Sequence, residues 1–153
     1  MIHPVSTRRN SSRAGQWLMS AALCGMLTLT GCTQLADASK DGEKLDADAH
    51  SAMSRGDWKS IYADADPQMR SDTSEEKFGA LFTAIAKKLG NPVSSKQTRW
   101  NLNATTSGTY LRSECETKFS NNASGTETFE WKKTDGKYRL YSYHISSDDL
   151  ITR

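Results

Sequence analysis

The chain has 153 residues, with 20 lysines and arginines against 18 aspartates and glutamates. The first 31 residues hold three of the basic side chains and none of the acidic ones, so the other 122 carry 17 basic against 18 acidic groups, a net charge of −1. This balance argues against a basic nucleic-acid surface, and 122 residues are enough for one ordinary domain.

The chain begins with a segment typical of exported proteins. Arg8, Arg9 and Arg13 precede an apolar run over residues 17–29, and small residues follow it. A basic flank, a short apolar core and a small-residue end are the three parts of a secretory signal. The run is shorter than the ~20 residues that a membrane-spanning helix needs. The sequence therefore favours a removable leader over residues 1–31 rather than a permanent anchor helix.

The end of this leader resembles the lipobox of bacterial lipoproteins. Leu29 stands where that motif has a branched apolar residue, Thr30 and Gly31 stand where it has small ones, and Cys32 follows directly. The resemblance implies cleavage between Gly31 and Cys32, with lipid on the Cys32 sulfur and on the new amine. Two or more fatty chains hold a protein stably at a membrane. The alternative is an ordinary signal peptide with an unrelated cysteine nearby.

The same resemblance implies a location. Thr33 stands where the sorting pattern of enteric lipoproteins has an aspartate for inner-membrane retention. We therefore expect a lipid-anchored protein of the cell envelope, with the periplasmic face of the outer membrane favoured in a Gram-negative host. The covalent lipid on Cys32 is the one non-protein group expected, and no cofactor is implied.

Helices are predicted in the first half of the mature chain. The small, polar and charged residues 32–42 predict a tether, and a single domain is predicted over residues 43–146. The spacing of apolar residues predicts a helix over 43–55, and Asp57 can cap a second, short helix that ends at Pro67. Thr73 and Glu76 have the spacing of a capping box. They precede a third helix with an apolar stripe over 78–89 and a stop at Gly90.

After Pro92 the apolar period changes from 3.6 to 2, which predicts four strands near 99–103, 110–119, 128–132 and 137–145. The second strand alternates, so Leu111, Ser113, Cys115, Thr117 and Phe119 share one face. Asp135-Gly136 predicts a hairpin turn. The apolar parity changes within the last strand, which predicts a β-bulge near Tyr141-Ser142. Residues 147–153 are predicted to be a polar tail.

These elements predict an α+β fold in which about three N-terminal helices pack on one face of a four-stranded antiparallel meander. Their order resembles the cystatin-like and nuclear-transport-factor-two-like shape, and in particular short uncharacterised bacterial exported domains. The resemblance is carried by residues 58–62, 78–90, 110–119 and 135–145. These are core and turn positions, which imply a fold and no particular chemistry.

Few side chains have the spacing of a reactive site. Cys115 has no partner once Cys24 and Cys32 are accounted for, which predicts a small buried side chain, with an intermolecular bridge as the alternative. His50 and His144 lack metal-ligand spacing and are interpreted as surface or satisfied histidines. An acid–base pair of His144 with Asp64 or Asp66 is the catalytic alternative. The acidic stretch over residues 46–72 lacks the calcium-loop pattern, which favours a solvated face.

The aromatic residues supply the remaining candidates for recognition. Most are expected in the core, and Trp58, Tyr62, Trp131 and Tyr143 are the candidate pocket or contact residues. No catalytic or metal residue is assigned. The sequence predicts a non-enzymatic binding or accessory module that contacts another envelope protein or a small apolar ligand. The alternatives are a small pocket enzyme of nuclear-transport-factor-two-like shape, and an inhibitor or assembly factor.

Overall fold

The computed structural model describes residues 30–152, with side chains from residue 37 onward. Residues 1–29 of the predicted leader lie outside the described residues, as do the side chains of Thr30 and Cys32. The described elements follow in the order α1 (Thr30–Ser54), α2 (Trp58–Ala63), α3 (Pro67–Asp72), α4 (Glu75–Lys88), β1 (Pro92–Thr105), β2 (Gly108–Phe119), β3 (Ala123–Thr134), β4 (Lys137–Ser146) and α5 (Asp149–Thr152).

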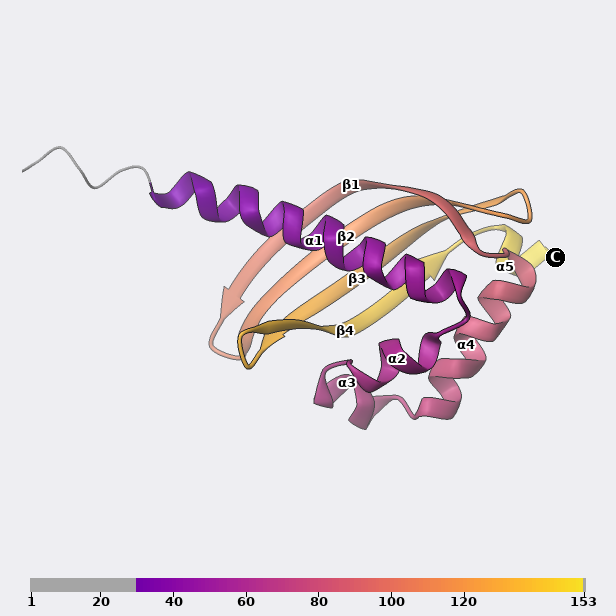
Figure 1. The fold of residues 1–153 in the computed structure, drawn as a ribbon, viewed down its shortest axis with the longest axis horizontal. Helices are drawn as coiled ribbons and strands as arrows, with labels where there is room; N and C mark the ends of the chain where they lie inside the picture. Colours follow the sequence, from indigo (N-terminus) through magenta and orange to yellow (C-terminus); the bar gives the residue numbers. More distant parts are fainter. Residues whose placement is uncertain (1–29, 153) are drawn as a thin grey trace, which may run out of the picture.

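The four strands form one antiparallel sheet in the order β1-β2-β3-β4, with α1 lying across it and α2, α3 and α4 gathered beyond one edge (Figure 1). This confirms the predicted α+β fold with an antiparallel meander. Asp135 and Gly136 have φ values of 52° and 78° at the hairpin between β3 and β4. Such positive values are those of a two-residue type I′ turn.

The predicted bulge in β4 is confirmed. Glu130 faces Ser142 and Trp131 faces Leu140, so Tyr141 is the extra residue on β4. The insertion turns the strand by one side-chain position. As a result Tyr138 and Leu140 before the bulge join Tyr143 and Ile145 after it at the core.

The core lies between the helices and the inner face of the sheet. The alternation in β2 is confirmed, because residues 111, 113, 115, 117 and 119 are all buried. From the helix side, α4 contributes Phe78, Phe82 and Ile85, and its C-cap Leu89 is buried too. Leu81, which the predicted stripe also included, is 41% exposed. Gly90 ends α4 with a φ of +86°, a conformation that glycine adopts at little cost.

The first helix begins earlier than predicted. α1 starts at Thr30 instead of Glu43, so the residues predicted to form a tether are helical. Ala38 is 5% exposed and Gly42 is buried as well. Small residues at this four-residue spacing let the helix lie close to the sheet, and their low hydrophobicity hides them from an apolar-period argument. The folded domain therefore extends N-terminal of residue 43.

Three smaller predictions are also corrected. Pro67 does not merely end a segment; it is the first residue of α3, where its missing N–H costs nothing, and Asp66 caps that helix. The cap of α4 is Ser74 rather than Thr73, and its hydroxyl accepts a bond from the Lys77 amide. The predicted polar tail contains α5, whose Leu150 carbonyl accepts a bond from Lys88.

Candidate functional site

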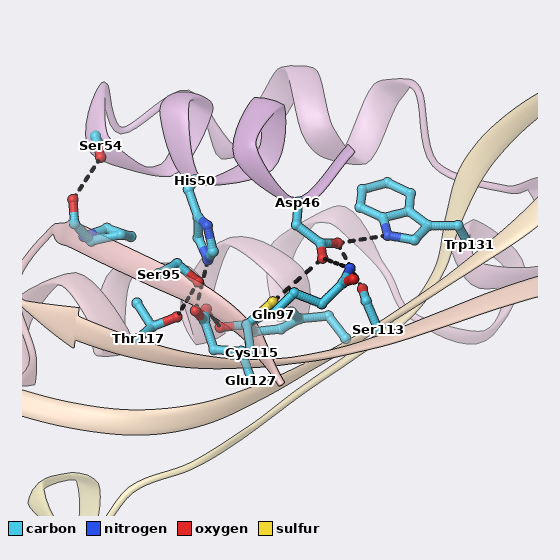
Figure 2. A network of polar contacts seen from close by, with 12 residues as sticks. Asp46, His50, Ser54, Ser95, Gln97, Ser113, Cys115, Thr117, Glu127 and Trp131 are labelled. Atoms are coloured by element: carbon cyan, nitrogen blue, oxygen red, sulfur yellow. Dashed lines mark hydrogen bonds and ion pairs between the residues drawn. The ribbon is translucent and has the colours of Figure 1, made fainter. Parts of the chain in front are cut away.

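A buried polar network joins α1 to the inner face of the sheet (Figure 2). Asp46 and His50 stand one helical turn apart on the face of α1 that meets the strands. Their partners come from β1, β2 and β3. Glu127 on β3 in turn accepts from Tyr143 on β4, so the network crosses the whole sheet. It is the largest cluster of buried ionisable groups in the described residues.

Asp46 is 3% exposed and accepts hydrogen bonds on both carboxylate oxygens. Oδ1 accepts from the Ser113 hydroxyl at 2.8 Å and from the Trp131 indole N–H at 2.9 Å. Oδ2 lies 3.4 Å from the Cys115 sulfur and 3.5 Å from the Gln97 amide nitrogen. Burial raises the pKa of Asp46, and the four donors oppose that rise because they bind the ionised form.

Glu127 is fully buried and is held from two sides. His50 Nε2 lies 2.7 Å from one carboxylate oxygen, and the Tyr143 hydroxyl donates to the other at 2.7 Å. Burial first, and then the charge of Glu127, raise the pKa of Tyr143 well above its usual value. Tyr143 therefore keeps its proton and acts as a donor. The His50 ring also packs edge-on against Phe129, 5.4 Å between centroids.

Cys115 belongs to the same network and is 2% exposed. Burial, followed by the neighbouring Asp46 charge, raises the pKa of its thiol to about 12. Since the thiolate is the reactive form, both the burial of this cysteine and its raised pKa disfavour its reaction at neutral pH. The prediction that Cys115 is buried is confirmed. Its thiol also donates a hydrogen bond to Asp46.

The network is complete within itself. In the described part of the chain, every fully buried side-chain nitrogen or oxygen has a hydrogen-bond partner. Fully satisfied buried networks fix one arrangement of the elements that carry them. A slide of α1 by one turn, about 5.4 Å, would break the bonds of Asp46 and His50 together. The arrangement is suited to holding α1 in register on the sheet.

The structure does not bring the acid–base alternative together. Asp64 pairs with Arg139 at 2.6 Å, and Asp66 accepts from Thr134 at 2.6 Å while capping α3. His144 is exposed on the outward side of β4. Across residues 30–152, no group of three or more His, Cys, Asp or Glu side chains is arranged to hold a metal ion.

The four aromatic candidates do not converge on one pocket. Trp58 lies in an apolar hollow of ≈ 230 Å³ that Met53, Phe82 and Ile85 also line. Trp131 lines a second hollow of ≈ 220 Å³, and Tyr143 a third of ≈ 310 Å³. The Tyr62 hydroxyl donates to the Thr73 carbonyl at 2.9 Å, which ties α2 to the segment before α4.

A larger hollow of ≈ 630 Å³ lies at one end of the sheet, largely on its outward face. We call it the outer hollow. Two cross-strand rows supply much of its lining, one of Lys96, Glu116, Thr126 and Ser146, the other of Ser94, Lys118 and Ser124. Asp148 stands at its rim. Its small hydroxyl-bearing residues leave room between the longer side chains.

Sequence reasoning missed Glu127 and assigned Asp46, with the acidic stretch over residues 46–72, to a solvated face, whereas both side chains are buried. Each occupies a position whose pattern neighbours are buried: Asp46 lies four residues from Gly42 and His50, and Glu127 lies two residues before Phe129 on the inward parity of β3. The position of these residues on a buried face, rather than their residue type, could have indicated that they are buried. Acidic residues at core positions imply a buried partner.

A family model described as "Protein of unknown function (DUF4019)" matches residues 47–143. The matched range contains His50, Glu127 and Tyr143 and begins one residue after Asp46. Among solved structures, the chain is similar to one described as a "Putative NTF2-like transpeptidase" from Campylobacter jejuni, at 18% identity and a TM-score of 0.47, covering 65% of this chain and 95% of that chain. None of the curated proteins compared with the sequence matches it. No helix in residues 30–152 is both long and apolar enough to cross a membrane.

Proposed function

The chain belongs to the DUF4019 family, and we propose that it is a non-enzymatic binding or accessory module held at the bacterial cell envelope by lipid on Cys32. The basic flank, the apolar run over 17–29 and the sequence Leu29-Thr30-Gly31-Cys32 support the anchor. Thr33 supports the periplasmic face of the outer membrane. The domain then works by contact with other envelope components at the surface to which it is attached.

The observation that carries the binding role is the outer hollow. Lys96, Glu116, Lys118 and Asp148 face it, and no hydrogen bond or ion pair engages their side chains within the described residues. By contrast, the buried acids Asp46 on α1 and Glu127 on β3 already have hydrogen-bond partners within the protein. Two cations and two anions among hydroxyl groups suit a polar partner that carries both charges, such as a segment of another envelope protein.

The anchor is tested by replacing its nucleophile. Cys32→Ala should move the protein from the membrane fraction to the soluble fraction, because no thiol remains to accept lipid. Mass spectrometry of the wild-type mature chain should show Cys32 as the first residue, with a mass increase of acyl groups. An unmodified first cysteine, or unchanged membrane partitioning of the variant, would remove the anchor from the proposal.

The contact surface is tested by reversing its charges. The double variant Lys96→Glu/Lys118→Glu should lose the partner that wild-type protein retains after cross-linking in cells and solubilisation in detergent. The matched control is Lys77→Glu/Lys87→Glu, which makes the same charge change on α4, none of whose residues lines the outer hollow. Equal recovery of the same partner by both variants would refute the assigned surface.

A small apolar ligand is the second candidate, supported by the apolar hollow beside Trp58. Native mass spectrometry of protein extracted from membranes should then show an added mass. Ala86 lines this hollow, so Ala86→Phe should fill it and abolish the added mass. If no small molecule accompanies the wild-type protein, the protein-contact role stands alone.

A further inference from the structure

The chain enters the domain at a defined end of the molecule. α1 begins at Thr30, directly after the apolar run over 17–29. In Figure 1 its start lies on the same side as the β1–β2 turn and the β3–β4 hairpin. The end of α4, α5 and the C-terminus lie on the opposite side. We call the first side, with residues 106–107 and 135–136 at its turns, the anchor end.

Little slack separates this end from the membrane attachment. Ala38 is buried, and a Cβ added to Gly42 would lie 3.3 Å from the Gln97 amide nitrogen and 3.4 Å from a Leu111 methyl carbon. The six helical steps from Cys32 to Ala38 span about 9 Å. Since α1 is continuous over this distance, it keeps the anchor end of the domain within reach of the bilayer.

The anchor end carries the chemistry of a membrane surface contact. Lys132, Lys133 and Lys137 flank the β3–β4 hairpin, where Asp135 is the one carboxylate between residues 132 and 137. The Lys132 amino group lies 5.8 Å from the Tyr110 ring centre and 5.5 Å from that of Tyr141, and Lys133 lies 5.5 Å from Tyr138. Tyrosine is enriched where membranes meet water.

Acidic groups also occur here and limit the attraction. Asp37 and Asp41 are exposed on the first turns of the described part of α1, together with Lys40. Burial is the larger cause of the raised pKa of Tyr138, and the negative charge of Asp41 is the second cause. Asp41 therefore lies close to the hairpin. The lysines therefore supply a modest local attraction. That suffices to orient a domain whose anchor already keeps it at the surface, because attachment raises the effective concentration of the second contact.

We propose that the anchor end rests on the bilayer, with Lys132, Lys133 and Lys137 against the phosphate groups of anionic lipids. This inference depends on the lipid anchor of the proposed function and goes beyond it, since it says which end of the domain faces the membrane. It leaves the outer hollow, at the other end of the strands, directed toward the periplasm. The attraction between lysines and an anionic surface is electrostatic and falls with added salt.

The test uses full-length protein, processed in its host, purified in detergent and placed in vesicles of phosphatidylcholine with or without phosphatidylglycerol. A dye is attached to Thr106→Cys at the anchor end, or to the control Lys87→Cys on the last turn of α4. Cys115 stays unlabelled because it is buried with a pKa raised to about 12. A headgroup-linked quencher then reports which dye lies nearer the bilayer.

We expect stronger quenching at position 106 than at 87 when phosphatidylglycerol is present. This difference in quenching should disappear in the triple variant Lys132→Glu/Lys133→Glu/Lys137→Glu. It should also disappear at high salt in labelled protein that keeps the three lysines. Equal quenching at the two positions, in protein that still floats with the vesicles, would overturn the orientation and leave the anchor intact. If the difference in quenching between positions 106 and 87 is the same in pure phosphatidylcholine as with phosphatidylglycerol, the proposed lysine contact would be overturned. Wild-type protein that fails to float would overturn anchor and orientation together.

Discussion

Two helices contact the same sheet by different chemistry. α4 presents an apolar stripe that includes Phe78, Phe82 and Ile85. α1 presents Ala38, Gly42, Asp46 and His50, one residue every four positions, of which the first pair is small and the second pair is polar. Both rows are buried, but only the row on α4 is visible in the sequence as a hydrophobic pattern.

The two kinds of contact contribute differently to the stability of the fold and to the placement of its helices. Burying an aromatic side chain contributes about 1.5–3 kcal/mol to folding. A satisfied internal hydrogen bond contributes a net of only about 0.5–1.5 kcal/mol, while a broken one leaves a costly orphan. We therefore expect the apolar stripe of α4 to supply more of the folding free energy than the polar row of α1, and the polar row to fix where α1 lies.

The largest effect is expected at α4. Phe78→Ala should lower the free energy of unfolding by about 4 kcal/mol, because it removes a 2%-exposed ring that packs on Tyr62 and Phe82. Urea denaturation followed by circular dichroism measures the loss. Leu81→Ala, at a 41%-exposed position of the same helix, is the control and should cost far less. Similar losses from the two would contradict the assigned role of the stripe.

Glu127→Ala should be the most damaging change in the polar network. It leaves His50 and the Tyr143 hydroxyl without their acceptor in a buried site, at a cost of about 3 kcal/mol. Glu127→Gln retains the shape, an acceptor for Tyr143 and a donor toward His50, so its loss should be less than half as large. The same urea titration compares the two, and equal losses would show that charge rather than hydrogen bonding matters at this position.

Asp46→Ala should cost about 2 kcal/mol, because the Trp131 N–H and the Ser113 hydroxyl lose their acceptor. Asp46→Asn keeps the oxygen that accepts both of these bonds, and its amide can face the Cys115 sulfur and a turned Gln97. The asparagine variant should therefore lie close to the wild type. A loss for asparagine as large as that for alanine would show that the network depends on the negative charge.

The smallest effect is a pH dependence specific to Asp46. Burial raises the pKa of this group in the folded protein above its ordinary value of 3.8, so the folded state binds the proton more tightly than the unfolded state. The contribution of Asp46 to stability is then fully present below the unfolded value and is lost as pH rises through the folded value. Relative to Asp46→Asn, the wild type should gain stability as pH falls through that interval. Parallel curves for the two proteins would contradict a raised pKa.

Much of the fold was predictable because its elements obey local patterns. The stripe of α4, the alternation of β2, the turn at Asp135-Gly136 and the bulge at Tyr141 all follow from residue spacing and turn chemistry. The extent of α1 did not follow, because Ala38 and Gly42 are buried by close approach rather than by hydrophobicity. α3 was missed because Pro67 can end one segment or open the next.

The polar network was predictable only in part. His50 was expected to be a surface or satisfied histidine, and it is satisfied by Glu127. That partner lies 77 residues away in the chain. No local pattern joins positions so far apart, and the pairing depends on how α1 crosses the strands. The same holds for Asp46 and Trp131, which lie 85 residues apart.

These long separations carry a consequence for the order of folding. Each strand of the meander pairs with its neighbour in the chain, so the hairpins close short loops at low entropic cost. The contacts of Asp46 and His50 close loops of 51 to 85 residues and gain nothing until the sheet exists. We expect α1 to dock after the rate-limiting step, so that Asp46→Ala speeds unfolding and leaves the refolding rate nearly unchanged in stopped-flow kinetics. A slowed refolding rate would instead place α1 in the nucleus.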